Sequence, residues 1–244
     1  MNLNTDTILI TGGSAGIGRA FAEAAHARGA RVIVTGRNET ALKTLAEAHP
    51  GMAWYALDMQ DAEAIKAFAA WVVADHPPLN AVVNNAGIMI AENVIDLDVA
   101  EATIATNLLG PIRLTHALLP HLKGQAKASI VTVSSGLAFV PLAATPVYSA
   151  TKAAIHSWSQ SLRAQLAGTS IRVIDWAPPA VATDLMPGHA ENPNSMPLAD
   201  FIAESAALFD AGHDDVQVER VKFLSQAERR GDYAQVFSAL NGSH

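Results

Sequence analysis

Tyr148 and Lys152, two residues whose side chains can exchange a proton, stand four positions apart in this chain. In a helix this spacing places both side chains on one face. A free tyrosine has a pKa of about 10 and is therefore a poor proton donor or acceptor at neutral pH. A positive charge beside it favours the phenolate and lowers that pKa. The pair therefore predicts acid–base chemistry near physiological pH.

A glycine-rich turn near the start of the chain predicts a binding site for phosphate groups. The apolar, β-branched residues 7–11 indicate a buried strand, and the alanine-rich segment after the turn favours a helix. Glycines allow the backbone to approach a pyrophosphate, and the helix N-terminus offers free N–H groups and the positive end of its dipole. The spacing of Gly12, Gly16 and Gly18 differs from the commoner G-x-G-x-x-G, and an ordinary tight turn is the alternative interpretation.

The rest of the chain alternates strand and helix patterns, which is typical of a parallel sheet covered by helices on both faces. We therefore expect one α/β unit over residues 1–244, a doubly wound, Rossmann-like sheet in a three-layer α/β/α arrangement. The expected strands span 7–11, 31–35, 52–57, 80–84, 128–134 and 170–176, and 216–218 is compatible with a short last strand. The expected helices span 16–28, 38–48, 61–74, 99–122 and 147–167.

Six features in one order, spread over most of the chain, resemble the short-chain dehydrogenase/reductase family. They are Thr11-Gly12-x-x-x-Gly16-Ile17-Gly18, Asp58, Asn84-Asn85-Ala86-Gly87, Asn107, Ser134-Ser135 followed by Tyr148-x-x-x-Lys152, and Pro178 through Thr183. The stretches 134–141 and 177–181 are similar to a subgroup labelled as oxidoreductases associated with D-alanine transfer to cell-wall polymers.

The resemblance implies a catalytic set of four residues. Tyr148 would donate a proton to the substrate oxygen, and Ser135 would add a second hydrogen bond that orients this oxygen. Lys152 would lower the pKa of the tyrosine and hold the nicotinamide ribose, while Asn107 would hold a water that passes protons to Lys152. The family places its serine thirteen positions before the tyrosine, which selects Ser135 over Ser134. For Asn107 the alternative is a structural, helix-breaking asparagine.

The end of the second expected strand favours NADP over NAD. By resemblance, NAD-binding members carry an acidic residue where this chain has Gly36, and here Arg37 follows. A guanidinium can hold the 2′-phosphate of NADP with two hydrogen bonds, whereas a solvated charge at a helix start is the alternative. Ala15 departs from the basic residue that many NADP-binding members have in the glycine turn. The remaining cofactor contacts implied are Gly12, Ser14, Gly16, Ile17, Gly18, Asp58, Met59, Asn85, Ala86, Gly87, Tyr148, Lys152, Pro178, Val181 and Thr183.

Some of these residues have a stated role or a competing interpretation. Asp58 would accept a hydrogen bond from the adenine amino group, and the alternative is an N-cap, for which Asp61 is better placed. Val181 and Thr183 would contact the nicotinamide amide, although Pro179 stands where the family usually has glycine.

The segment after the sixth expected strand is interpreted as a substrate lid over residues 183–206, with a plain surface loop as the alternative. His156, one helical turn after Lys152, is interpreted as a packing or surface residue. The apolar residues that flank the site predict a largely apolar substrate pocket. They are Leu137, Phe139, Val140, Leu185 and Met186.

Composition argues against several other classes of partner. The net charge is −7, the pI is about 5.7 and no basic patch is present, so nucleic acid is not expected. The chain has no cysteine, and its histidines lack metal-ligand spacing, so no metal site is expected. The first residues lack the features of a signal peptide, and no apolar run reaches the roughly 18–20 residues of a membrane span. We therefore expect a cytoplasmic protein without membrane contact.

The function expected from these features is NADP(H)-dependent hydride transfer between nicotinamide and a carbonyl or secondary alcohol of a small, largely apolar substrate. The alternative is a regulatory or scaffold protein that binds the dinucleotide without turnover. The helices at 99–122 and 147–167 carry more apolar residues than one stripe requires, which predicts a symmetric homodimer and leaves a tetramer open. These apolar residues include Ile104, Leu108, Leu114, Leu118, Ile155, Trp158 and Leu162.

Overall fold

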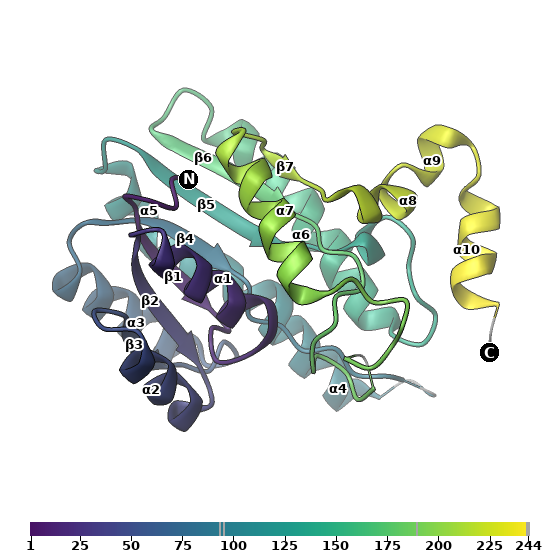
Figure 1. Ribbon diagram of the computed structural model, residues 1–244, viewed down its shortest axis with the longest axis horizontal. Helices are drawn as coiled ribbons and strands as arrows, with labels where there is room; N and C mark the ends of the chain where they lie inside the picture. The colour runs from purple at the N-terminus through teal and green to yellow at the C-terminus, as the bar shows by residue number, and fades with distance from the viewer. Residues whose placement is uncertain (93, 95, 189, 243–244) are drawn as a thin grey trace.

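Seven parallel strands form one sheet in the computed structural model, which describes residues 1–92, 94, 96–188 and 190–242 (Figure 1). The order across the sheet is β3-β2-β1-β4-β5-β6-β7, and each neighbouring pair is parallel. Because the order changes direction between β1 and β4, a crevice opens at the carboxyl ends of the strands. The strands are β1 (Thr7–Thr11), β2 (Arg31–Gly36), β3 (Ala53–Ala56), β4 (Leu79–Asn84), β5 (Ala128–Val133), β6 (Ile171–Trp176) and β7 (Asp215–Val216).

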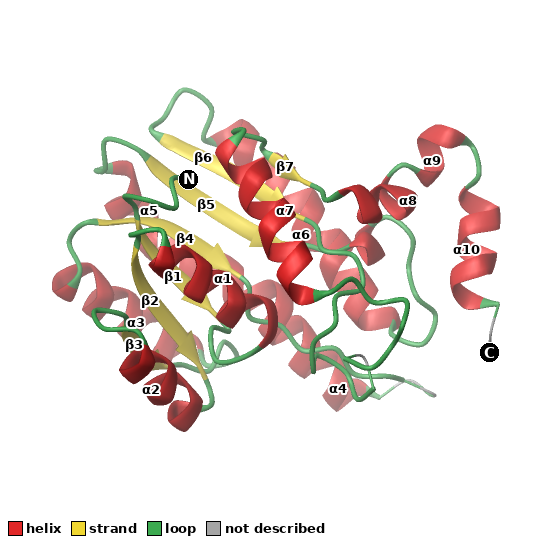
Figure 2. Ribbon diagram, in the orientation of Figure 1, coloured by secondary structure: helices red, strands yellow, loops and turns green. Residues whose placement is uncertain are grey.

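Helices cover both faces of the sheet, as the colouring by secondary structure in Figure 2 makes plain. One layer consists of α1 (Gly16–Ala27), α2 (Glu39–Ala48) and α7 (Leu198–Asp210), and the other of α3 (Ala62–Asp75), α5 (Gly110–Lys123) and α6 (Pro146–Gln165). This arrangement confirms the expected doubly wound, Rossmann-like sheet in three layers. The remaining elements are α4 (Leu97–Ile104), the π-helix η1 (Ala105–Leu109), η2 (Gly136–Ala138), η3 (Glu219–Val221), α8 (Lys222–Ser225), α9 (Ala227–Arg230) and α10 (Tyr233–Asn241).

The core lies in two apolar layers, one on each side of the sheet. On one side Trp176 at the end of β6 stacks on Phe201 with ring centroids 5.3 Å apart, and Phe21 packs beside it at 4.9 Å. On the other side Phe68 of α3 packs against the sheet. Strands β1, β2, β4 and β5 are almost wholly buried because helices cover both of their faces, which explains their continuous apolar sequences.

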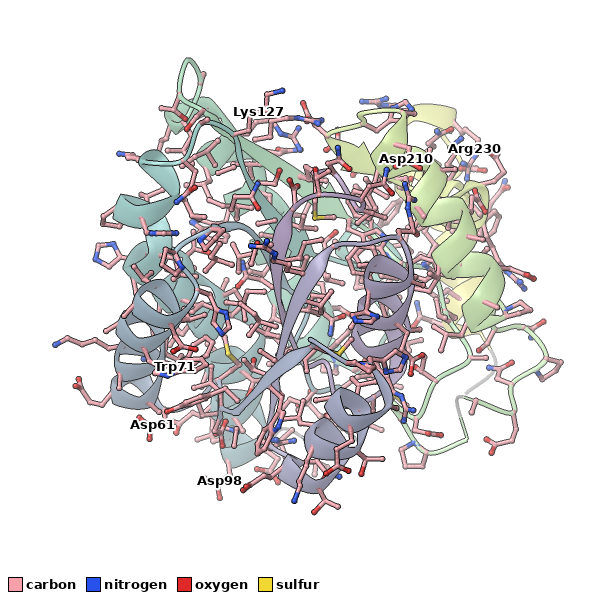
Figure 3. The ribbon with its side chains drawn as sticks, turned by 60° about the vertical axis from the view of Figure 1, so that its left-hand side comes forward. Asp61, Trp71, Asp98, Lys127, Asp210 and Arg230 are labelled. Atoms are coloured by element: carbon pink, nitrogen blue, oxygen red, sulfur yellow. The ribbon has the colours of Figure 1, made fainter. Side chains whose placement is uncertain are left out.

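The helix expected at 99–122 is longer and is interrupted. It runs from Leu97 to Lys123 as α4, η1 and α5, and the π-helical turn at 105–109 contains Asn107. A π-turn inserts one residue into the helical repeat and is common at functional sites. The start of α3 matches its sequence signal, because Asp61, labelled in Figure 3, caps the helix by accepting hydrogen bonds from the N–H groups of Glu63 and Ala64.

Two expectations about the C-terminal third need correction. The last strand lies at 215–216, one residue before the range 216–218, because the pairing of Asp175 and Trp176 with β7 ends there. The range 183–206 is not a single loop, because α7 begins at Leu198 and packs beside α1 against the sheet. The loop proper is therefore 183–197, and His189 within it lies outside the described residues.

The apolar stripe proposed for dimerisation is mostly consumed within the single chain. Leu114, Leu118, Ile155 and Leu162 are buried, so they cannot supply a second apolar face. Ile104 is 39% exposed. Residues Leu108 and Trp158 are partly buried. Among the helices that the structure describes, none is both long enough and apolar enough to cross a bilayer.

Candidate active site

A cleft of about 1400 Å³ follows the carboxyl ends of the strands. It extends from the turn after β1 and the end of β2, past the residues that follow β4, to the start of α6 and the C-terminal segment. This is the crevice that the reversal of strand order predicts. All of the catalytic and cofactor-binding residues expected from the sequence line this cleft except Gly18 and Asn107. Of the residues expected to form an apolar substrate pocket, Leu137 and Leu185 line it, whereas Phe139, Val140 and Met186 do not.

The glycine turn at one end of the cleft is held against the loop that follows β4. Gly12 and Gly16 have φ values of +67° and +53°, which L side chains rarely adopt. The amide of Asn85 donates to the Thr11 carbonyl at 2.8 Å, and the Thr11 hydroxyl accepts from the N–H groups of Asn85 and Ala86 at 3.0 Å. The two turns therefore form one rigid wall.

Helix α1 begins at Gly16 without a side-chain cap. Its first N–H groups are therefore available to a ligand, and the positive end of the helix dipole faces the same place. A Cβ on Gly18 would lie 2.4 Å from both the Asn85 amide nitrogen and the Gly12 carbonyl oxygen. Gly18 thus permits the close packing of the two turns and is not among the residues that line the cleft, and its expected contact with the cofactor stays a prediction.

The end of β2 forms the far end of this wall. A Cβ on Gly36 would lie 3.1 Å from the Ser14 hydroxyl, so the absence of a side chain leaves room beside Ser14. Arg37 follows and is exposed, and Asn38 caps α2 by accepting from Ala41 N–H at 3.0 Å. Across the cleft, Asp58 is exposed, and among the described residues its carboxylate accepts from Gln60 N–H alone, at 3.0 Å. The carboxylate therefore retains acceptor capacity toward a ligand.

Tyr148, Ser135 and Lys152 meet at the inner part of the cleft. Ser135 follows β5, and Tyr148 and Lys152 occupy the first turns of α6. The Ser135 side chain lies near enough to the phenol of Tyr148 to lower its pKa, and its oxygen accepts from Leu137 N–H at 3.1 Å. The Lys152 Nζ lies 5.4 Å from the centroid of the tyrosine ring. Ser134 also lines the cleft, but its buried hydroxyl has no partner within the described part of the chain. The structure therefore pairs Ser135 with the tyrosine.

The electrostatics of this group differ from the expectation. Burial raises the pKa of Tyr148 to about 12, and the hydrogen bond from Ser135 only partly opposes it. Burial likewise lowers the pKa of Lys152 to about 8, while the carboxylate of Asp175 acts in the opposite direction. The expected lowering of the tyrosine pKa by Lys152 is therefore wrong for this structure. The Lys152 ammonium donates to the Val133 carbonyl at 2.8 Å. Desolvation of the phenol is the largest influence on the pKa of Tyr148.

Asn107 lies behind the cleft and not on its surface. Its side-chain oxygen accepts from Ile88 N–H at 2.9 Å, and its amide donates to the Ile88 carbonyl at 2.9 Å and to the Thr151 hydroxyl at 3.3 Å. A Cβ on Gly87 would lie 3.4 Å from this oxygen and 3.7 Å from the Lys152 Nζ. Asn107 thus joins the π-turn, the loop after β4 and α6. The helical chain continues through the π-turn into α5, so Asn107 does not end it. Its role in holding a water stays a prediction.

The segment after β6 closes the cleft on its other side. The Pro178 carbonyl accepts from Gly136 N–H at 2.8 Å, which ties this segment to the one that carries Ser135. Val181 is buried and pairs with Met196 in an isolated bridge, so the two ends of the 183–197 loop are fastened together. A Cβ on Gly16 would meet the Thr183 side chain at 3.5 Å, so Thr183 lies opposite the glycine turn.

Sequence reasoning missed one wall of the cleft, which comes from the C-terminal segment. Phe223, Leu224 and Leu240 line the cleft together with the expected residues Leu137 and Leu185. The segment is held in place by the Asn241 amide, which donates to the Pro141 carbonyl at 3.1 Å, and by the buried cluster of Val140, Ala227 and Val236. The apolar pattern of 233–240 was the only available signal, and nothing local indicated what it would cover.

The comparisons with known proteins agree with this geometry. Residues 6–194 match the family model for short chain dehydrogenases. An uncharacterized oxidoreductase from Bacillus subtilis, DltE, is 37% identical over 249 aligned positions, covering 99% of this chain and 98% of the relative. This similarity confirms the expected resemblance to the subgroup associated with D-alanine transfer.

Two solved structures are also similar. A short-chain dehydrogenase from Streptomyces avermitilis has 29% identity and a TM-score of 0.83, covering 97% of this chain and 96% of that one. A short chain dehydrogenase from Shigella flexneri complexed with NADP has 27% identity and a TM-score of 0.74, covering 81% of this chain and 89% of that one. Together with the family match, these similarities show that the chain belongs to the short-chain dehydrogenase/reductase family of oxidoreductases.

Proposed function

We propose that this protein transfers a hydride between NADP(H) and a carbonyl or secondary alcohol of a small, largely apolar substrate. One observation carries the proposal: Ser135, Tyr148 and Lys152 together line the inner part of a cleft that leads to a glycine turn and an uncapped helix N-terminus. A proton donor and a dinucleotide cradle thus share one cavity.

The residues of the cleft fit a dinucleotide in several respects. The uncapped start of α1 suits a pyrophosphate, and Asp58 retains acceptor capacity for an adenine amino group. Gly87 leaves the floor of the cleft open in front of Asn107 and Lys152, where a side chain would fill the space. The nicotinamide group, when bound, supplies or accepts the hydride. Lys152 is proposed to hold its ribose, and Val181 and Thr183 its amide.

Preference for NADP rests on the end of β2. The space beside Ser14 that an acidic side chain at position 36 would fill is open, and the exposed guanidinium of Arg37 lines the cleft. A guanidinium and a hydroxyl are suitable donors for a 2′-phosphate. The similar structure from Shigella flexneri, which contains NADP, supports this choice. Ala15 offers no third donor from its side chain, so Arg37 carries most of the preference.

For catalysis, Tyr148 is proposed to donate its proton to the oxygen of the reduced substrate. Because its pKa is about 12, the phenol keeps its proton throughout the neutral range. An alkoxide is a stronger base than a phenolate, so the transfer is favourable once hydride addition has placed charge on the oxygen. Ser135 donates a second hydrogen bond to that oxygen, and the Lys152 ammonium stabilises the phenolate that remains.

The substrate end of the cleft is mostly apolar, and a loop covers it. Leu137, Leu142 and Leu185 face it together with the C-terminal residues described above. Arg220 donates to the Asn194 carbonyl at 2.8 Å and so connects the 183–197 loop to the segment that follows β7. We propose that this loop is the substrate lid, with Val181 and Met196 as its fixed ends.

The decisive experiment combines a substrate panel with one variant. Aldehydes, ketones and secondary alcohols are followed at the nicotinamide absorbance with NADPH, NADH and their oxidised forms. On any substrate found, Tyr148→Phe should lose most of its turnover while binding NADPH with nearly unchanged affinity, since only the hydroxyl is removed. A variant with unchanged kcat would show that the tyrosine does not serve as the proton donor. Dinucleotide binding without turnover of any compound would favour a regulatory or scaffold role.

Arg37→Ala tests the cofactor choice separately. A charge-assisted hydrogen bond contributes about 1.5–3 kcal/mol, or roughly ten- to a hundredfold in affinity. NADPH should lose this factor in a fluorescence titration, whereas NADH should be little affected. Equal affinities of the wild-type protein for both cofactors would contradict the preference.

A further inference from the structure

Two charged side chains, Lys152 and Asp175, are buried among the residues that the structure describes, and they have opposite charges. The proposed mechanism uses Lys152 and leaves Asp175, on β6, without a role. Asp175 is 1% exposed, and one of its carboxylate oxygens has no hydrogen-bond partner within the described chain. Burying a carboxylate costs several kcal/mol unless it is compensated, and an apolar residue would fill this place without that cost.

The other oxygen of Asp175 contacts a histidine on the catalytic helix. The Asp175 Oδ2 lies 2.5 Å from the Nδ1 of His156, and the His156 ring packs on Phe139 with centroids 4.6 Å apart. His156 is one turn after Lys152 on α6, so both residues occupy one helical face. This face packs on the sheet, because the Lys152 Nζ donates to the Val133 carbonyl at 2.8 Å.

The pairing of the strands brings the two buried charges to the same interface. In the parallel register of β5 and β6, Thr132 is opposite Asp175 and Val133 is opposite Trp176. The Thr132 hydroxyl contacts Ser159 of α6 at 2.6 Å, so the side chains at this level of the sheet face the helix. Lys152 and Asp175 therefore lie in one layer between α6 and two neighbouring strands.

Among the surrounding charges, the carboxylate of Asp175 acts on the pKa values of both Lys152 and His156. This carboxylate raises the pKa of Lys152 against the effect of burial, and it raises the pKa of His156 through their hydrogen bond. Asp215 also raises the pKa of His156 and Arg163 lowers it. These two residues form an exposed ion pair with each other, 2.8 Å apart.

We propose that Asp175, oriented by His156, is a positioning residue for Lys152: its carboxylate compensates the buried ammonium and keeps it charged beside Tyr148. This inference rests on the proposed function, in which the charged lysine stabilises the tyrosinate and holds the cofactor ribose. His156, interpreted from the sequence as a packing or surface residue, orients the carboxylate through the hydrogen bond between its Nδ1 and the Asp175 Oδ2.

The first test reads the charge of Lys152 directly. In protein labelled with ¹⁵N-lysine, the Nζ signal that is missing from Lys152→Met is followed by NMR as the pH rises. Asp175→Asn keeps the shape and an acceptor for His156 but removes the charge, and it should move the Lys152 midpoint down by about one pH unit. Asp215→Asn, which removes an exposed carboxylate near the same histidine, is the matched control and should leave the midpoint unchanged.

The reciprocal test covers the case in which Asp175→Asn does not fold. Coupling between two sites is mutual, so Lys152→Met should raise the midpoint of His156, because the carboxylate then has one fewer cation to share. Lys66→Met, a substitution at an exposed residue of α3, should not. An unmoved Lys152 midpoint in folded Asp175→Asn, or an unmoved His156 midpoint in Lys152→Met, would overturn the proposal.

A kinetic readout connects the pair to the reaction. On a turned-over substrate, Asp175→Asn should shift the alkaline limb of kcat to lower pH by the same amount as the NMR midpoint, whereas a merely structural loss would lower kcat evenly at every pH. The NMR titrations need no substrate, so a protein without turnover would refute the proposed function while the coupling of Lys152 and Asp175 is still decided.

Discussion

The burial of Lys152 predicts a measurable dependence of stability on pH. The folded chain lowers its pKa from 10.5 to about 8. One pH unit corresponds to about 1.4 kcal/mol, so the difference corresponds to about 3 kcal/mol. Between these two pH values the unfolded chain binds the additional proton. Stability therefore rises with pH in this window. The penalty for burying the ammonium is complete below about pH 8 and disappears as the pH approaches 10.5.

Lys152→Met isolates this effect, because methionine has similar length and no charge. The variant also loses the hydrogen bond to the Val133 carbonyl, which adds a nearly constant offset at each pH. The free energy of unfolding is measured by urea titration between pH 7 and 10. The difference, wild type minus variant, should rise by about 2–3 kcal/mol over this range, since most of the 3 kcal/mol is then recovered.

Lys66→Met provides the control, because Lys66 is exposed on α3. Its curve should run parallel to that of the wild type. A difference between wild type and Lys152→Met that is independent of pH would refute the reasoning, because it would mean that the ammonium is not desolvated in the folded protein.

Four further outcomes follow from the structure. Gly18→Ala should lose about 1–3 kcal/mol of stability and most dinucleotide binding, because its Cβ would lie 2.4 Å from two atoms of the neighbouring turns. Urea unfolding measures the loss of stability, and fluorescence titration measures the loss of binding. Carbonyl reduction should decline above about pH 8 as Lys152 loses its proton, which a pH–rate profile at saturating NADPH checks. Arg220→Ala should raise the KM of the substrate two- to tenfold, the value of one hydrogen bond to the proposed lid, without weakening NADPH binding. Light scattering should give a mass of about twice the 25.6 kDa of one chain, and a wild-type monomer would contradict the dimer. The side chains of Ile104 and Leu109 are both more than a third exposed, so the double variant Ile104→Glu with Leu109→Glu should reduce the mass to that of a monomer.

Features that depend on neighbouring residues could be predicted from the sequence alone. The apolar runs of 7–11 and 128–134 indicated strands because the pattern of a doubly covered strand is local. The four-residue spacing of Tyr148 and Lys152 indicated a shared helical face for the same reason. The motifs, taken in order, indicated the family, and the structure brings Ser135 to Tyr148 as the thirteen-residue spacing implied.

Only the tertiary structure decided the quantities that depend on burial and on distant segments. The sequence shows that an ammonium is near a phenol, but the sign of the tyrosine pKa shift depends on how much water the fold removes from both groups. The π-turn contains Asn107, whose side chain bonds to the backbone of Ile88, nineteen residues earlier, and only the tertiary structure brings these two segments together. Asp175 reads as one acidic residue in an apolar strand, and only the register of β5, β6 and α6 places it in the layer that contains Lys152.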